Sequence, residues 1–131
     1  MPGFVVKGRP ISVQASGQSK TTWKASVAAA AGPKFPAPLN HNNIRIRITF
    51  YFNTLPDFDT DNMSKPICDA LIGVAYSDDN QLCERIARRK DINGSYRIRG
   101  ISPELAVAIA EGNDFVFIEI EQVEPHEENL L

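Results

Sequence analysis

Positions 44–52 of the chain read IRIRITFYF. Its first half alternates apolar and polar residues, which is the period-2 pattern of a strand with one buried face. Its end, Phe50 to Phe52, is apolar on both faces, which is typical of a strand inside a sheet. We therefore predict an interior strand over residues 44–52.

Outward from this strand, strand and helix patterns alternate along the chain. The expected strands cover residues 4–7, 82–91 and 115–120, with a further one at 96–99 after the hairpin signal Asn93-Gly94. The expected helices run from a Thr21 or Thr22 cap to Ala31, from Met63 to Ile72 after an Asp61 or Asn62 cap with Pro66 in its first turn, and from Ser102 to Gly112-Asn113. Residues 12–20 are expected to form a loop. This order predicts an α+β fold: a single small domain with a mixed β-sheet of about four strands and two to three helices.

Length and composition fit one domain. The chain has 131 residues and is 43% hydrophobic, enough for a core without disulfide staples. We expect a domain over 1–124 and an acidic C-terminal tail over 125–131. No apolar run reaches the ~20 residues of a membrane span, and the N-terminus lacks a signal-peptide layout. The expected location is cytoplasmic, with Cys68 and Cys83 as reduced thiols.

The net charge of −2 conceals an uneven distribution. Residues 1–56 carry seven Lys and Arg and no acid, whereas residues 101–131 carry eight acids and no Lys or Arg. A basic half suits a polyanion such as nucleic acid and an acidic half does not. Charge placement is therefore more informative than the total.

Aspartates gather directly after the central strand. Asp57, Asp59 and Asp61 stand at alternate positions, and Asp78-Asp79 follow 17 and 18 residues after Asp61. If the intervening helix packs back on the sheet, we expect both acidic groups to meet at one sheet end. Carboxylates so close together repel unless a cation neutralises them. Mg²⁺ prefers one or two carboxylates with water and phosphate.

Lys65 lies one helical turn after Asp61 and projects from the same side. A lysine beside a metal-bound phosphate can stabilise the transition state or the leaving oxygen. Asp69, another turn on, can orient Lys65 as an ion pair. One pair of aspartates alone is most simply interpreted as a helix cap or a turn, whereas five aspartates in two clusters with a lysine at helical spacing favour a catalytic site over this structural alternative. An EF-hand is excluded, because its sixth and twelfth positions hold Asn62 and Cys68 instead of Gly and Glu.

The whole pattern resembles the RusA family of Holliday-junction resolvases. The matching residues are Asp59-Thr60-Asp61-Asn62-Met63-Ser64-Lys65, Asp69-Ala70-Leu71, Gly73 and Asp78-Asp79-Asn80-Gln81. The opening segment Gly8 to Gln14 and Trp23-Lys24 also look like the family's N-terminal part. Asp57 lies outside the shared pattern.

The resemblance implies a small homodimeric nuclease, often phage- or prophage-encoded, that uses Mg²⁺ or Mn²⁺ to nick branched DNA. Carried over by motif, Asp59, Asp61 and Asp79 are the metal-binding carboxylates and Lys65 is the catalytic lysine. Asn62 and Asp78 are supporting residues. A dimer presents two identical sites to the near two-fold symmetric four-way junction.

DNA binding requires Lys and Arg contacts to phosphates. The candidates are Lys20, Lys24, Arg85, Arg88, Arg89 and Lys90. The run Arg88 to Lys90 places charge on both faces of its strand, so only part of it can face one DNA surface. The alternative is an edge strand with protective charges. Trp23 is interpreted as a core residue rather than a base-stacking one.

The leading hypothesis is Mg²⁺-dependent resolution of Holliday junctions by paired nicks, in recombination and repair. A nuclease for other branched DNA has the same sequence signals. A non-catalytic DNA- or protein-binding module would use the aspartates structurally. A phosphohydrolase for small substrates is disfavoured, because the chain has neither a Gly-rich phosphate loop nor a His cluster.

Overall fold

A four-stranded mixed sheet forms the centre of the computed structural model, which describes residues 3–12, 17–55, 59–94 and 101–123. The strand order is β1-β4-β2-β3. The β2–β3 pair is parallel, and the β1–β4 and β4–β2 pairs are antiparallel. The strands are β1 (Gly3–Lys7), β2 (Ile44–Phe52), β3 (Leu82–Asp91) and β4 (Phe115–Gln122). The predicted α+β class is confirmed.

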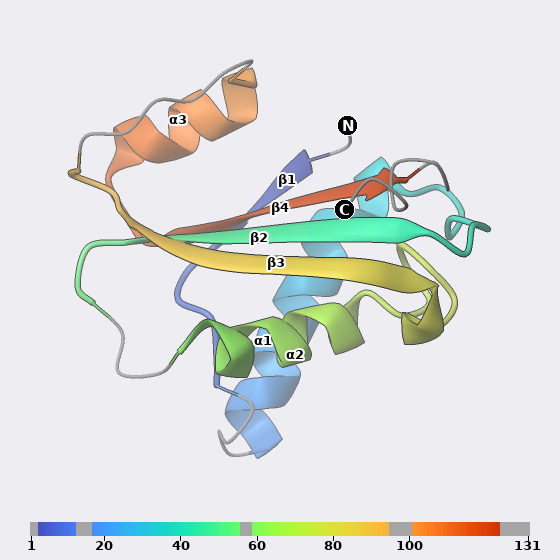
Figure 1. Cartoon of the computed structure of the whole chain (residues 1–131). Coiled ribbons are helices and arrows are strands. Elements are labelled where there is room, and N and C mark those ends of the chain that lie inside the picture. The colour runs from blue at the N-terminus through green and yellow to red at the C-terminus, as the bar shows by residue number, and fades with distance from the viewer. Residues whose placement is uncertain (1–2, 13–16, 56–58, 95–100, 124–131) are drawn as a thin grey trace.

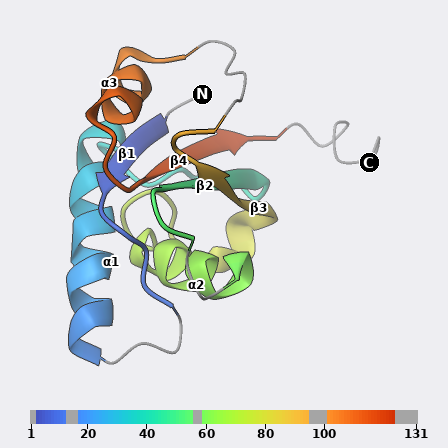
Figure 2. The same ribbon diagram turned by 90° about the vertical axis from the view of Figure 1, so that its left-hand side faces the viewer.

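Helices cover the two faces of the sheet unequally. The α-helices are α1 (Gly17–Ala31), α2 (Thr60–Ala70) and α3 (Pro103–Glu111), and two short 3₁₀ helices are η1 (Gly32–Lys34) and η2 (Asp79–Gln81). Both α1 and α2 lie against one face, and α3 lies over one end of the other (Figures 1 and 2). None of the helices in the described residues is long and apolar enough to cross a membrane.

The strand β2 lies between β4 and β3, as its sequence predicted. Ile44, Ile46, Ile48 and Phe50 are fully buried in the core that α1 and α2 cover. Tyr51 points to the other face and stacks on Phe115 at a ring-centroid distance of 4.6 Å, in the smaller cluster beneath α3. Burial on both faces anchors the strand that leads to Asp59 and Asp61.

Helix α1 begins earlier than predicted. It starts at Gly17, so the expectation of a loop up to Lys20 and a cap at Thr21 or Thr22 is wrong. Its buried residues Trp23, Val27 and Ala31 recur at four-residue spacing, while the first turn is polar and mostly exposed. Apolar periodicity detects only the part of a helix that packs, and it therefore missed this turn.

Helix α2 also begins earlier, at Thr60, with Asp59 as its N-cap rather than Asp61 or Asn62. It ends at Ala70 rather than Ile72, and Gly73 follows with a φ of 87°. Pro66 consequently lies inside the helix, and its expected place in the first turn is wrong. A proline there removes one backbone hydrogen bond, and its ring is buried against the core side of the helix.

Helix α3 has the predicted ends. The Ser102 hydroxyl accepts a hydrogen bond from the Leu105 N–H at 3.2 Å, and Gly112 closes the helix in the left-handed conformation at a φ of 75°. Three predictions fall outside the described residues: the strand at 96–99, the tail at 125–131 and any role of Asp57.

Candidate active site

The N-terminal end of α2 carries the first pair of predicted site residues. Asp59 caps the helix, and its Oδ1 accepts the Asn62 N–H at 3.0 Å. Asp61 lies in the first turn, where the positive end of the helix dipole favours a carboxylate. The Ser64 hydroxyl donates to the Asp61 main-chain oxygen at 3.1 Å, a bond that does not involve the Asp61 carboxylate.

A groove of about 550 Å³ lies between α2 and β3. Asp61, Ser64 and Lys65 line its α2 side, and Arg85, Ile86 and Ala87 line its β3 side. The structure therefore brings Asp61, Lys65 and Arg85 together. An acid, a lysine and an arginine in one open groove can receive a phosphodiester, because cations bind its oxygens and a carboxylate can hold a metal ion.

Lys65 and Asp69 form the predicted ion pair along α2. The Lys65 Nζ lies 3.2 Å from both carboxylate oxygens of Asp69. The lysine side chain is 56% exposed, so the pair contributes little to stability and leaves the ammonium accessible. Asp69 thus holds Lys65 beside the groove that Asp61 faces.

The second acidic pair lies in η2 and is held by Gln81. Asp78 caps η2, and its Oδ1 accepts the Asn80 N–H at 2.9 Å. Gln81 closes the capping box, because its Oε1 accepts the N–H groups of Ser77 and Asp78 at 2.8 and 2.9 Å. Its Nε2 donates to the carbonyl oxygens of Leu39 and His41. Gln81 was missed as an anchor, although Asp followed three residues later by Gln is a capping-box signal.

Within one chain, the two acidic pairs lie at opposite ends of the β2–α2–β3 crossover. In the parallel register Ile44 pairs with Leu82 and Phe52 pairs with Asp91. Asp59 follows the end of β2, whereas Asp79 directly precedes the start of β3. Among the described residues there is no group of three or more His, Cys, Asp or Glu side chains arranged to hold a metal ion.

The expectation that both pairs meet at one sheet end is therefore wrong for a single chain. The two acidic pairs lie apart because β3 runs parallel to β2. A helix that packs back on the sheet and leads into a parallel strand must return the chain to the end where β2 began.

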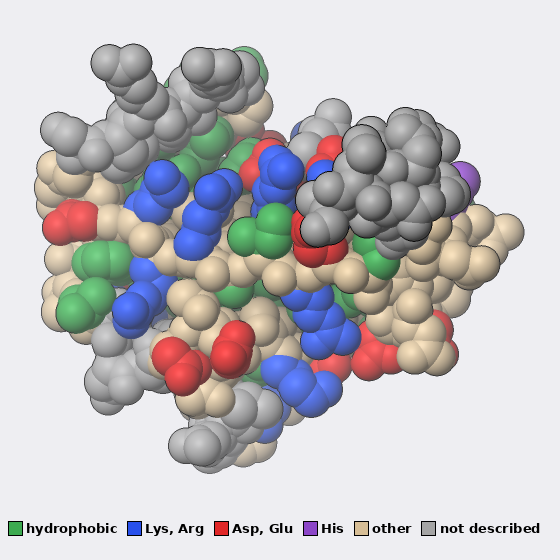
Figure 3. Space-filling view, viewed as in Figure 1, with side chains coloured by type: hydrophobic (Ala, Val, Ile, Leu, Met, Phe, Trp, Pro, Cys, Tyr) green, Lys and Arg blue, Asp and Glu red, His purple; other side chains and the backbone are tan. Residues whose placement is uncertain are grey.

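The basic residues of β3 divide between the two faces of the sheet. Arg85 and Arg89 lie on the α2 side, in register with Ile46 and Phe50. Arg88 and Lys90 lie on the other side, where the Arg88 Nε donates to the Thr49 hydroxyl at 3.1 Å. Figure 3 shows Lys and Arg side chains above and below this strand. Lys20 and Lys24 belong to α1 instead, and the structure does not gather all six predicted DNA-binding residues on one surface.

A buried hydrogen bond holds the C-terminal end of α2. The Tyr76 hydroxyl donates to the Cys68 main-chain oxygen at 2.6 Å. Burial raises the pKa of the Cys68 thiol to about 11 and also raises the pKa of Tyr76. Both groups are therefore neutral at pH 7, and they stabilise the helix end rather than take part in proton transfer. Cys83 is exposed on β3.

The fold and groove define a class: a small α+β domain with aspartates and a lysine at a helix start, facing a basic strand. A family model described as Endodeoxyribonuclease RusA matches residues 4–109. The chain therefore belongs to the RusA family of structure-specific endodeoxyribonucleases, which are Holliday-junction resolvases. A search of curated proteins found no match.

The family match ends at residue 109, inside α3, whereas the last strand of the sheet, β4, follows that residue. β4 lies between β1 and β2 and pairs with both, so residues 115–122 complete the domain that the match covers in part.

Proposed function

We propose that this protein is a Mg²⁺-dependent endonuclease that resolves Holliday junctions by paired nicks, and that it acts as a homodimer. The observation that carries the proposal is the groove in which Asp61, Lys65 and Arg85 face one another. Family membership supplies the class of reaction, and the groove supplies residues that suit it.

The carboxylates suit a hard divalent ion. Asp59 uses one carboxylate oxygen as a helix cap, and Asp61 lines the groove. Mg²⁺ accepts few protein oxygens and keeps several waters. When bound, such an ion supplies an activated water and neutralises charge at the phosphate. Mn²⁺ accepts the same ligands.

Asp79 is the third proposed ligand. Within one chain it lies apart from Asp59 and Asp61, so the proposed function of the dimer is to bring Asp79 of one copy to the Asp59 and Asp61 of the other. A two-fold axis that brings Asp79 of one copy beside Asp61 of another does so twice, because a C2 contact is reciprocal. Each site would then combine the start of α2 from one copy with η2 from its partner. Two equal sites suit two nicks on matching strands.

The remaining polar residues have roles that follow from their positions. The Lys65 ammonium, held by Asp69, stabilises the negative charge that develops on the phosphate during cleavage. Arg85 and Arg89 bind phosphates on the α2 side of β3, and Arg88 and Lys90 bind phosphates on its other side. Lys20 and Lys24 contribute a separate basic surface on α1.

The proposal is tested by cleavage of matched four-way junctions, forks and linear duplexes with Mg²⁺. We expect nicking of the junction well above that of the duplex.

Asp61→Asn and Asp79→Asn should each abolish nicking while junction binding is retained, and Asp91→Asn on β3 serves as a matched control that cleaves normally. Equal rates on all three DNAs would favour a general branched or duplex nuclease. Unchanged cleavage by both variants would refute a catalytic role for these aspartates.

A further inference from the structure

A hydrogen-bonded cluster at the sheet end where β2 stops and β4 starts holds the chain where it leaves β2. The Asp114 Oδ1 accepts the Asn53 N–H at 2.7 Å, and its Oδ2 accepts Arg9 Nη1 at 2.8 Å. The same Arg9 nitrogen donates to the Thr54 main-chain oxygen at 3.1 Å. Asn53 and Thr54 are the first two residues after β2, so both are held by groups from distant parts of the sequence.

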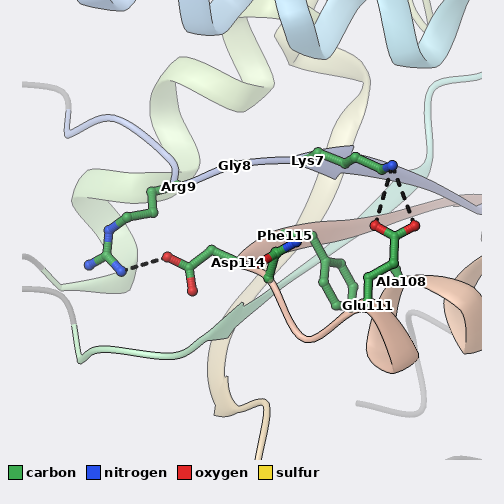
Figure 4. Close-up of a pocket in the computed structure, with 8 residues that line it drawn as sticks. Lys7, Gly8, Arg9, Ala108, Glu111, Asp114 and Phe115 are labelled. Carbon is green, nitrogen blue, oxygen red and sulfur yellow. Dashed lines mark hydrogen bonds and ion pairs between the residues drawn. The ribbon is translucent and has the colours of Figure 1, made fainter.

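Further contacts join the residues of this cluster. The Asn53 Nδ2 donates to the Gly112 main-chain oxygen at 2.7 Å, and the Gly8 N–H donates to the Asp114 main-chain oxygen at 2.9 Å. The Arg9 guanidinium lies 5.5 Å from the centroid of the Phe50 ring. The Asp114 side chain is 16% exposed, whereas that of Arg9 is 41% exposed. Figure 4 shows the Arg9–Asp114 pair beside a second pair, Lys7–Glu111.

We propose that Asp114 is a positioning residue for the nuclease site: it fixes the start of the segment that connects β2 to Asp59. Asp59 follows Thr54 by only five positions, and metal ligands must be held within about half an ångström of their working geometry. By accepting hydrogen bonds from Asn53 and Arg9, Asp114 fixes the point from which the chain runs to Asp59. Asp114 lies beyond residues 4–109, the part of the chain that the family model matches.

This inference rests on the proposed function, because it assigns Asp59 to metal binding. A purely structural role for Asp114 predicts something different: lower stability, with unchanged metal affinity in the molecules that remain folded. The two roles are therefore separated by metal affinity, measured with Mn²⁺ as the probe.

The chain offers a matched control. The Lys7 Nζ lies 3.3 Å from the Glu111 Oε2, and this pair links β1 to the end of α3. Glu111→Gln thus removes an ion pair from the same region and leaves Asn53 and Thr54 anchored. Asp114→Asn keeps an oxygen that can accept the Asn53 N–H, whereas Asp114→Ala removes both acceptors.

The experiment compares the wild type with Asp114→Ala, Asp114→Asn and Glu111→Gln in three measurements. They are Mn²⁺ binding by calorimetric titration without DNA, the Mg²⁺ concentration that gives half-maximal junction nicking, and junction affinity in EDTA. We expect Asp114→Ala to weaken Mn²⁺ binding and raise the Mg²⁺ requirement by about tenfold, as for other residues that orient metal ligands. Asp114→Asn should lie between, with Glu111→Gln like the wild type and junction affinity in EDTA unchanged.

The inference is overturned if Asp114→Ala binds Mn²⁺ as tightly as the wild type, or if Glu111→Gln shows the same loss. Should Asp114→Ala fail to fold, Asp114→Asn decides by the same criterion. If the wild type nicks no branched DNA, the proposed function fails, and the Mn²⁺ titration still tests the positioning of Asp59 separately.

Discussion

The two ends of the β2–α2–β3 crossover both carry aspartates, but the fold uses them differently. At the start of α2, Asp59 makes one capping bond and Asp61 faces the groove beside Lys65. At η2, Asp78 is engaged in a complete capping box with Gln81. The family motif assigns metal binding to Asp79, and the capping box that engages Asp78 agrees with a supporting role for Asp78.

The lysine at the α2 end is predicted to have a large effect on the nicking rate. Lys65→Ala should slow junction nicking by about a hundredfold, because a charge that stabilises the transition state is lost. Asp69→Asn leaves the ammonium in place and should cost only a few-fold, in line with the small contribution of an exposed ion pair. Single-turnover nicking rates measure both. A Lys65→Ala protein that nicks at the wild-type rate would remove Lys65 from the site.

The two aspartates of η2 are separated by opposite effects on stability and on nicking. Asp78→Ala should lower the free energy of unfolding by about 1 kcal/mol through loss of the cap, and the folded protein should still nick DNA. Asp79→Ala should leave stability within about 0.5 kcal/mol of the wild type, as for most surface changes, and should abolish nicking. Urea titrations and nicking rates on the same samples test this crossed pattern. The reverse pattern would assign the metal-binding role to Asp78.

The smallest effect is expected at Cys68 in α2, between the two ends of the crossover. Cys68 is buried, and its raised pKa of about 11 keeps it protonated, whereas Cys83 is exposed. A thiol reagent at pH 8 should therefore modify one thiol per native chain and a second only after unfolding. Because the unfolded chain loses the Cys68 proton first, this group should lower stability as pH rises from 9 to 11. Rapid modification of both thiols in the native protein would show that α2 does not pack as described.

Local patterns were sufficient for most of the secondary structure. The alternation in residues 44–52 predicted β2 and its interior place, and Ser102 and Gly112 predicted both ends of α3. The early starts of α1 and α2 were missed because exposed polar turns carry no periodic signal. The motif from Asp59 to Gln81 also predicted the family, which the match over residues 4–109 confirmed.

The relative placement of residues that are far apart along the chain could not be predicted from the sequence. The direction of β3 relative to β2 depends on strand pairing, and it placed Asp61 and Asp79 apart. The Arg9–Asp114 contact joins residues 105 positions apart, so no local pattern could indicate it. The site residues themselves remain predictions that the geometry makes specific enough to test.

The shared site is tested most directly by mixing two variants, Asp61→Asn and Asp79→Asn, after subunit exchange. If each site takes Asp61 from one copy and Asp79 from its partner, a mixed dimer has one site with both substitutions and one with neither. Nicking of a four-way junction should then return from near zero to about one quarter of the wild-type rate, because half the dimers are mixed and each has one intact site. A mixture that stays as inactive as either variant alone, with exchange demonstrated by differently tagged subunits, would contradict the account.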